Sequence, residues 1–133
     1  MVLPITATVA AICALLLLAT GIETVQQRLR LKVAFGDAGA DALVRASRSH
    51  GNLAEHAPIV ILMLGLLEMN HARPVVLGSI AAAFVVGRIA HIIGLHMASV
   101  PGQAPIPRQI GVVTTWASLA GLGVWLLVML LAG

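Results

Sequence analysis

The segment RASRSHGNLAEHAPIVILML, residues 45–64, joins a polar half to an apolar half, and it decides the fold. The apolar run that begins in its second half covers residues 57–67, which is about half of the ~20 residues that a transmembrane helix needs. The polar half contains no proline, and Gly51 is its single helix breaker. We therefore expect one continuous membrane helix that carries charged side chains along part of its length.

The composition of the whole chain supports a membrane protein. Of its 133 residues, 59% are hydrophobic and 10% are charged, whereas soluble domains are about 45–50% apolar and ~25% charged. A soluble domain of this size has too much surface to cover with so few polar groups. The basic residues behind the net charge of +3 are not clustered on a soluble module, so we expect no nucleic-acid partner. Cys13 is the single cysteine, which excludes an internal disulfide.

Apolar segments predict four transmembrane helices over residues 2–33, 41–69, 74–97 and 109–132, within one domain of residues 1–133. The first segment has no Lys or Arg before its apolar run, and its length suits a full span, so we expect a retained helix and not a signal peptide. The connections are short and rich in Gly, Asp or Pro. The predicted fold is therefore an all-α integral membrane protein, a four-helix antiparallel bundle.

The distribution of positive charge predicts the orientation. Basic residues gather around the first connection, at Arg28, Arg30, Lys32, Arg45 and Arg48, and Arg108 lies beside the third. The second connection has Arg73 beside Glu68. By the positive-inside rule, loops one and three are expected in the cytoplasm and both termini outside.

Polar side chains of the second predicted helix recur at intervals of four and three residues. They are Asp41, Arg45, Arg48, Asn52 and Glu55. At about 100° per residue they share one face of the helix, with His56 at its edge, whereas Ser47 and His50 are expected to point away. Such a stripe could consist of ion pairs that only hold the bundle together, or of arginines that reach toward the headgroups. Because ionisable groups inside a membrane are costly and tend to be functional, we favour a binding site.

The third predicted helix adds Arg88 and His91, which share a face with Leu95 near the same membrane surface. An arginine at this depth needs a partner, and Glu55 is the expected one, whereas a histidine such as His91 is more often a packing residue. Guanidinium groups match carboxylates, and a glutamate matches an ammonium group. A small peptide with two carboxylates and one amine fits this charge pattern, and an apolar second ligand could arrive from the bilayer.

The stretch RASRSHGNLAEHAP resembles the second-helix signature of the MAPEG family, the membrane-associated proteins of eicosanoid and glutathione metabolism. The signature, R-x-x-x-N-x-x-E-x-x-P, is filled by Arg48, Asn52, Glu55 and Pro58. FGDAGADALVRA, residues 35–46, resembles bacterial members, and GRIAHIIGL, residues 87–95, resembles the third-helix segment with Arg88 at its arginine. The resemblance covers the order of elements along essentially the whole chain.

This resemblance implies a homotrimer that binds glutathione as co-substrate between subunits at the cytoplasmic side. Glutathione contacts are implied for Arg48, Asn52 and Glu55, with Arg88 in the same pocket and Arg45 near it. His56 and His91 stand where members of the family often have tyrosine, and this chain has no tyrosine at all. An arginine is expected to stabilise the glutathione thiolate, because a nearby cation favours the ionised thiol. Arg108 and, at the end of the first helix, Arg28 or Arg30 are the candidates.

Three functions fit these residues. The resemblance favours a glutathione-dependent transferase or peroxidase of a bacterial inner membrane, whose thiolate attacks a hydrophobic electrophile. The alternative is a non-catalytic protein of the same fold that binds a lipid or a partner. Transport through Arg88, His91 and Glu55 is a third possibility, which the absence of broken helices and inverted repeats disfavours.

Overall fold

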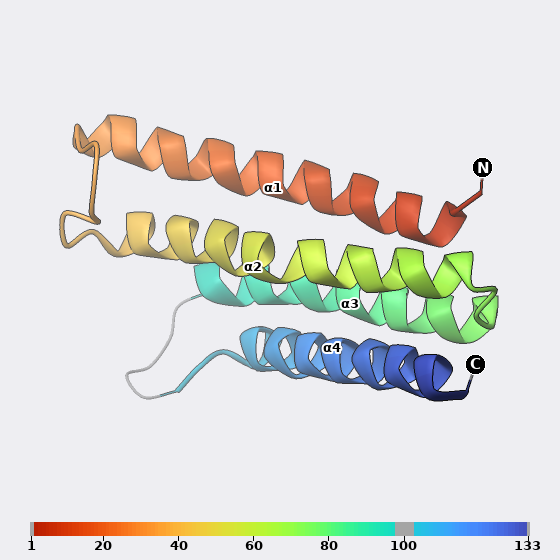
Figure 1. The fold of residues 1–133 in the computed structure, drawn as a ribbon. Helices are drawn as coiled ribbons and strands as arrows, with labels where there is room; N and C mark the ends of the chain where they lie inside the picture. Colours follow the sequence, from red (N-terminus) through yellow and green to blue (C-terminus); the bar gives the residue numbers. More distant parts are fainter. Residues whose placement is uncertain (1, 98–102, 133) are drawn as a thin grey trace.

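The computed structural model describes residues 2–97 and 103–132, which form four long α-helices. In chain order they are α1 (Pro4–Leu31), α2 (Asp41–Met69), α3 (Pro74–His96) and α4 (Ile106–Ala132) (Figure 1). Proline stands in the first turn of α1 and α3, where its missing N–H costs no helical hydrogen bond. Helix α4 begins three residues before the expected position 109, with Pro107 in its first turn. The predicted all-α membrane fold is confirmed.

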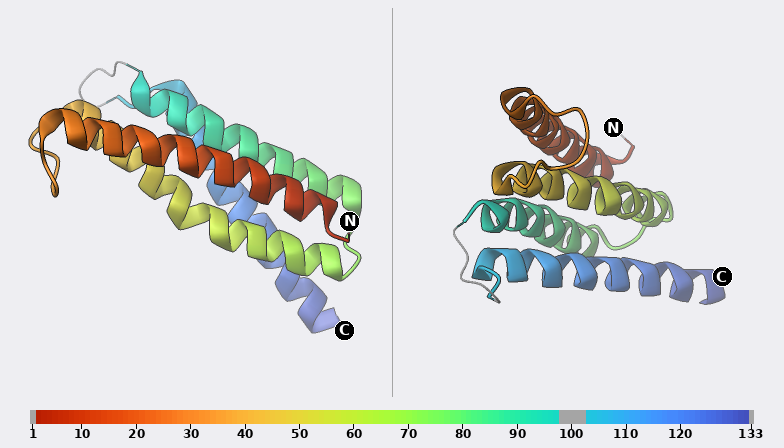
Figure 2. Two further views of the ribbon diagram at one scale, coloured as in Figure 1. Left: turned by 90° about the horizontal axis from the view of Figure 1, so that it is seen from above. Right: turned by 90° about the vertical axis from the view of Figure 1, so that its left-hand side faces the viewer.

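The helices lie in a stack and do not close into a square bundle. Helix α1 packs on α2, and α4 packs on α3, whereas α1 and α4 share no contact in the described part of the chain. Figure 2 shows α1 and α4 on opposite sides of the α2–α3 pair. We call the end of the stack where α2 and α4 begin the Arg48 end, and the opposite end, where both termini lie, the Glu68 end (Figure 1).

Helix α2 is continuous through both its polar and its apolar halves, and Pro58 lies inside it. One face is buried along the whole length, and it includes Leu43, Leu53, Val60, Leu64 and Leu67. Leu77 and Phe84 of α3, Leu122 of α4 and Val9 and Cys13 of α1 belong to the same core. The polar stripe lies on another side of the same helix, so α2 joins the core to the polar surface.

The outer faces of the stack are apolar. Large exposed side chains include Leu15, Leu18 and Ile22 on α1 and Val124, Leu127 and Leu131 on α4. All four helices are long and apolar enough to cross a bilayer. Association of helices in lipid depends on close packing, because lipid tails are as apolar as leucine.

The first turn of α1 is capped by a side chain from α2. The Glu68 carboxylate accepts hydrogen bonds from Ile5 N (2.9 Å), Thr6 N (2.8 Å) and Thr6 Oγ1 (2.7 Å). The first N–H groups of a helix have no partner within the helix, and a carboxylate there also meets the positive end of the helix dipole. Glu68 therefore ties the start of α1 to the end of α2.

We expect Glu68→Ala to lower the free energy of unfolding by about 1–2 kcal/mol, because the N–H groups of Ile5 and Thr6 lose their acceptor. Thermal unfolding of the purified protein in detergent measures the change. Glu55→Ala is the matched control, since Glu55 is an exposed glutamate of the same helix whose carboxylate has no hydrogen-bond partner among the described residues. Equal stabilities of the two variants would contradict a capping role.

Candidate functional site

A large cleft lies at the Arg48 end, between α2, the end of α3 and the start of α4. It encloses about 630 Å³, and we call it the arginine cleft. Its polar lining consists of Asp41, Arg45, Arg48, Asn52 and Arg108, and its apolar lining includes Leu95, Met97 and Pro105. Helical spacing brings the α2 residues together, and the first turn of α4 adds Arg108 from the other side.

A second cleft adjoins the first and encloses about 430 Å³. We call it the loop cleft, because Gly36 and Asp37 of the α1–α2 connection line it together with Ser47, Gly51 and Glu55 of α2. Arg48 and Asn52 line both clefts and so form the ridge between them.

The connection at the loop cleft is held in place by Arg28. Its Nη1 donates to the carbonyl oxygens of Ala34 (3.0 Å) and Gly36 (3.2 Å). Gly36 has φ +73°, a left-handed conformation that a glycine adopts without strain. Arg28 therefore fixes the loop that forms one wall of the cleft.

The structure brings together five of the predicted site residues. Arg45, Arg48, Asn52 and Arg108 line the arginine cleft, and Glu55 lines the loop cleft beside Arg48 and Asn52. Arg30 is exposed near the end of α1 and lines neither cleft. Of the three arginines predicted as candidates to stabilise a thiolate, Arg108 lines the arginine cleft and Arg28 lines the loop cleft, where it donates to carbonyl oxygens of the α1–α2 connection.

Arg88 and His91 lie elsewhere. Their side chains are 2% and 3% exposed, and they line neither cleft. Arg88 Nη2 donates to the carbonyl oxygen of Gly111 in α4 (2.8 Å), and its guanidinium carbon is 5.9 Å from the centre of the Phe84 ring. The expected Arg88–Glu55 pair does not form, because Arg88 is buried in the core whereas Glu55 is exposed on the outer side of α2.

His56, at the edge of the polar stripe, is partly buried, and its Nδ1 donates to the carbonyl oxygen of Asn52 (2.7 Å). It lines neither cleft. His50 points toward α1, where its Nδ1 is 3.2 Å from Thr20 Oγ1. The expectation that Ser47 points away was wrong, because the α1–α2 connection folds back and makes Ser47 part of the loop cleft.

Close contact between α3 and α4 positions Arg108. A Cβ atom on Gly94 would clash with the backbone N of Arg108, and one on Gly111 would come within 2.6 Å of Gly87 O. His91 Nδ1 also points at the carbonyl oxygen of Arg108, at 3.4 Å. Glycine at these positions lets the start of α4 approach α3, which brings the Arg108 side chain to the cleft.

The arginine cleft has an excess of positive charge. Its three arginines face one carboxylate, that of Asp41, which is 3.9 Å from Arg45 and whose side chain is 90% exposed. Within residues 2–97 and 103–132, the guanidinium groups of Arg48 and Arg108 make no hydrogen bond or ion pair. Two unpaired guanidinium groups in one cleft are suited to carboxylates of a bound ligand.

Comparison with known proteins gives the family. Residues 6–128 match the sequence model of the MAPEG family. The chain belongs to the MAPEG family. It is 32% identical over 115 residues to inner membrane protein YecN of Escherichia coli, in strain K12 and in strain CFT073, and the aligned region covers 86% of this chain and 84% of YecN. No solved structure matches the chain.

Family and fold agree on the cellular setting. Four helices in this MAPEG chain are able to span a membrane, so the protein is a multi-pass membrane protein. Its relatives are proteins of a bacterial inner membrane, which supports the predicted localisation.

In this MAPEG protein we expect Gly94→Ala to lower the free energy of unfolding by about 1–3 kcal/mol, because the added methyl group meets the backbone of α4. Gly121→Ala is the control: Gly121 is an exposed residue of α4 with open space around it, and alanine there is a better helix former. Thermal unfolding compares the two variants. A Gly94→Ala variant as stable as Gly121→Ala would contradict the close α3–α4 contact.

Proposed function

We propose that this protein binds glutathione in the arginine cleft and uses its thiolate to attack hydrophobic electrophiles that arrive from the bilayer. The observation that carries the proposal is the gathering of Arg45, Arg48 and Arg108 around one cleft of an otherwise apolar membrane protein. Ionisable residues within a transmembrane bundle are costly, and they are retained where they bind a substrate or ion.

The charge of the two clefts matches the charge of glutathione. The tripeptide has two carboxylates, one ammonium group and a net negative charge. Arginines in the arginine cleft can bind both carboxylates through paired N–H groups. The carboxylates of Glu55 and Asp37 in the neighbouring loop cleft are suited to the ammonium group, and Asn52 on the ridge can bind a peptide group. A ligand across the ridge would thus have its charges matched on both sides.

Arg108 is the residue we assign to the thiol. A guanidinium group beside a sulfur stabilises the thiolate, which is the nucleophilic form. In a transfer reaction this sulfur forms a bond to an electrophilic carbon, the leaving group departs with the bonding electrons, and the thiol proton passes to water. The apolar lining at Leu95, Met97 and Pro105 would receive the apolar part of the second substrate.

The same proposal has three copies of the chain assemble in the membrane. Arg48 and Glu55 are exposed on a spanning helix, and lipid is a poor environment for both. A neighbouring copy packed beside α2 would cover these side chains and enclose the clefts.

The alternative is a protein of this family that binds a lipid or a partner and has no catalytic activity. The burial of Arg88 and His91 in the core favours this alternative, since neither side chain reaches a cleft. This alternative also allows glutathione to bind, but it predicts no turnover of an electrophile.

We expect Arg48→Ala to weaken glutathione binding by about 10- to 100-fold, because it removes a charged hydrogen-bond donor at the ridge. Isothermal titration of the purified protein in detergent measures the affinity. Arg30→Ala is the matched control, since Arg30 is an exposed arginine that lines neither cleft. If a folded wild-type protein bound no glutathione at millimolar concentration, the proposal would be refuted.

For Arg108→Ala we expect turnover of an activated aryl halide to fall by about 10²-fold or more while glutathione still binds, since a cation that stabilises developing charge has an effect of this size. Arg108→Lys should retain more activity than Arg108→Ala, because the charge is kept. The rate is measured from absorbance of the thioether product. Glutathione binding without any turnover in the wild type would favour the non-catalytic alternative.

A further inference from the structure

We propose that the ion pair between Glu23 and His96 controls whether Arg45 is available to the arginine cleft, and that it does so through the protonation of His96. This inference rests on the proposed function, in which Arg45 binds a carboxylate of the ligand. Glu23 and His96 are thus positioning residues, which act on the ligand through Arg45.

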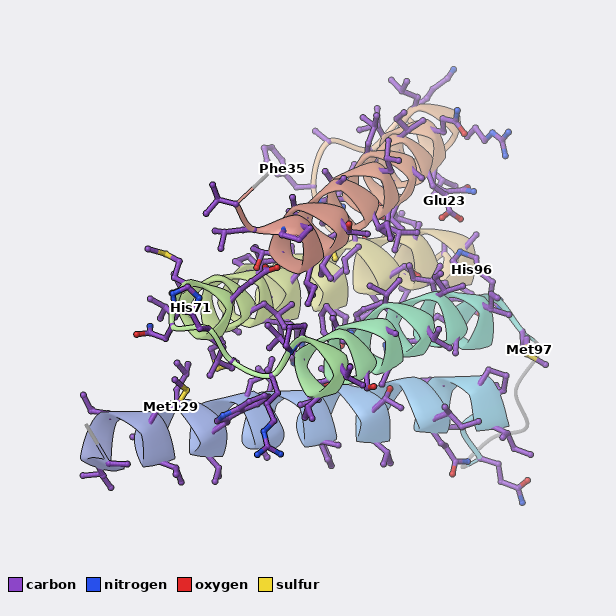
Figure 3. All side chains as sticks on the ribbon, turned by 90° about the vertical axis from the view of Figure 1, so that its right-hand side faces the viewer. Glu23, Phe35, His71, His96, Met97 and Met129 are labelled. Atoms are coloured by element: carbon purple, nitrogen blue, oxygen red, sulfur yellow. The ribbon has the colours of Figure 1, made fainter. Side chains whose placement is uncertain are left out.

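The pair joins α1 to α3 at the Arg48 end. His96 Nε2 is 2.8 Å from Glu23 Oε1, and His96 Nδ1 is 2.9 Å from the carbonyl oxygen of Ile92. Both ring nitrogens thus face oxygen acceptors, and only the imidazolium form can donate at both. Figure 3 shows the Glu23 and His96 side chains close together at one end of the stack, far from His71 at the other.

The pair is open to solvent, so its protonation can follow the pH of the medium. The His96 and Glu23 side chains are 37% and 34% exposed. They line a small cleft of about 180 Å³ together with Gln27 of α1 and Ala42 and Arg45 of α2. Among the described residues that line this cleft, Glu23, His96 and Arg45 are the charged or titratable ones.

Arg45 lies between this small cleft and the arginine cleft, because it lines both. It is held weakly in its present position. Its Nη2 is 3.9 Å from Asp41 Oδ2, and its Nε donates to the Asp41 carbonyl oxygen at 3.4 Å. An ion pair this exposed contributes little to stability, so the guanidinium group can turn toward either cleft.

Two carboxylates can therefore compete for Arg45: that of Glu23 and that of a ligand. While His96 is an imidazolium, it neutralises Glu23, and Arg45 is left for the ligand. When His96 loses its proton, the Glu23 charge has no partner across the helix pair and attracts Arg45 out of the arginine cleft. The ion pair is thus present at low pH and lost as the imidazole deprotonates, so ligand affinity falls as the pH rises.

The test is the affinity for S-methylglutathione, which has no thiol to titrate, at pH 5.5 and pH 8 with the full chain in lipid nanodiscs. We expect the wild type to bind about two- to fivefold more weakly at pH 8, which is the effect of one exposed charge pair. Glu23→Gln should bind with the higher affinity at both pH values, because no carboxylate competes for Arg45. His96→Gln should bind with the lower affinity at both, because Glu23 then always competes.

His71→Gln is the matched control, since His71 is an exposed histidine at the Glu68 end and should leave the pH dependence of the wild type unchanged. Opposite shifts in Glu23→Gln and His96→Gln support the inference. A pair that only held the helices together would weaken binding in both variants, and that result would overturn it. Equal pH dependence in the wild type and Glu23→Gln would overturn it as well.

A second measurement separates this inference from the proposed function. A double-mutant cycle of Glu23→Gln and His96→Gln in thermal unfolding should show coupling between the two positions at pH 5.5 and less at pH 8. Coupling without ligand binding in any variant would overturn the proposed function, and with it this role of the pair. Ligand binding without coupling would overturn the inference alone.

Discussion

Helix α2 must cross the membrane although half of it is polar, and the rest of the structure depends on this constraint. The apolar run of residues 57–67 is too short to span a bilayer, so the helix extends through Arg45, Arg48 and Asn52. Its buried leucines hold this polar half against the other helices. The charged side chains are therefore held on a helix at one end of the stack, where side chains are positioned more precisely than on a loop.

Close packing of α3 and α4 positions the other side of the arginine cleft. Small residues at Gly87, Gly94 and Gly111 bring the two helices into backbone contact, and Arg88 adds a hydrogen bond from α3 to the Gly111 carbonyl oxygen. If α3 and α4 moved apart, Arg108 would move away from Arg48. Arg108 comes from α4 and not from α2, and close packing of α4 on α3 places it at the cleft. The geometry of the cleft therefore depends on the packing of the core.

Local sequence patterns predicted the fold and one side of the site well. Hydropathy and segment length predicted four spanning helices, because both can be read from residues that are close together in the sequence. The spacing of Arg45, Arg48 and Asn52 predicted their common cleft for the same reason. Tertiary contacts were beyond these patterns: they could not reveal that Arg88 turns into the core, or that the α1–α2 connection reaches back to Ser47. Both depend on which helices touch, and helical periodicity carries no such information.

The cap at the Glu68 end has a consequence for how the protein is made. The first turn of α1 finds its acceptor in a side chain near the end of α2, 62 residues later in the chain. During synthesis, the start of α1 thus has no such partner until the second span has been translated and has crossed the bilayer. The first turn of α1 is therefore capped only after α2 has been inserted, so α1 and α2 reach their final structure together as one helical hairpin.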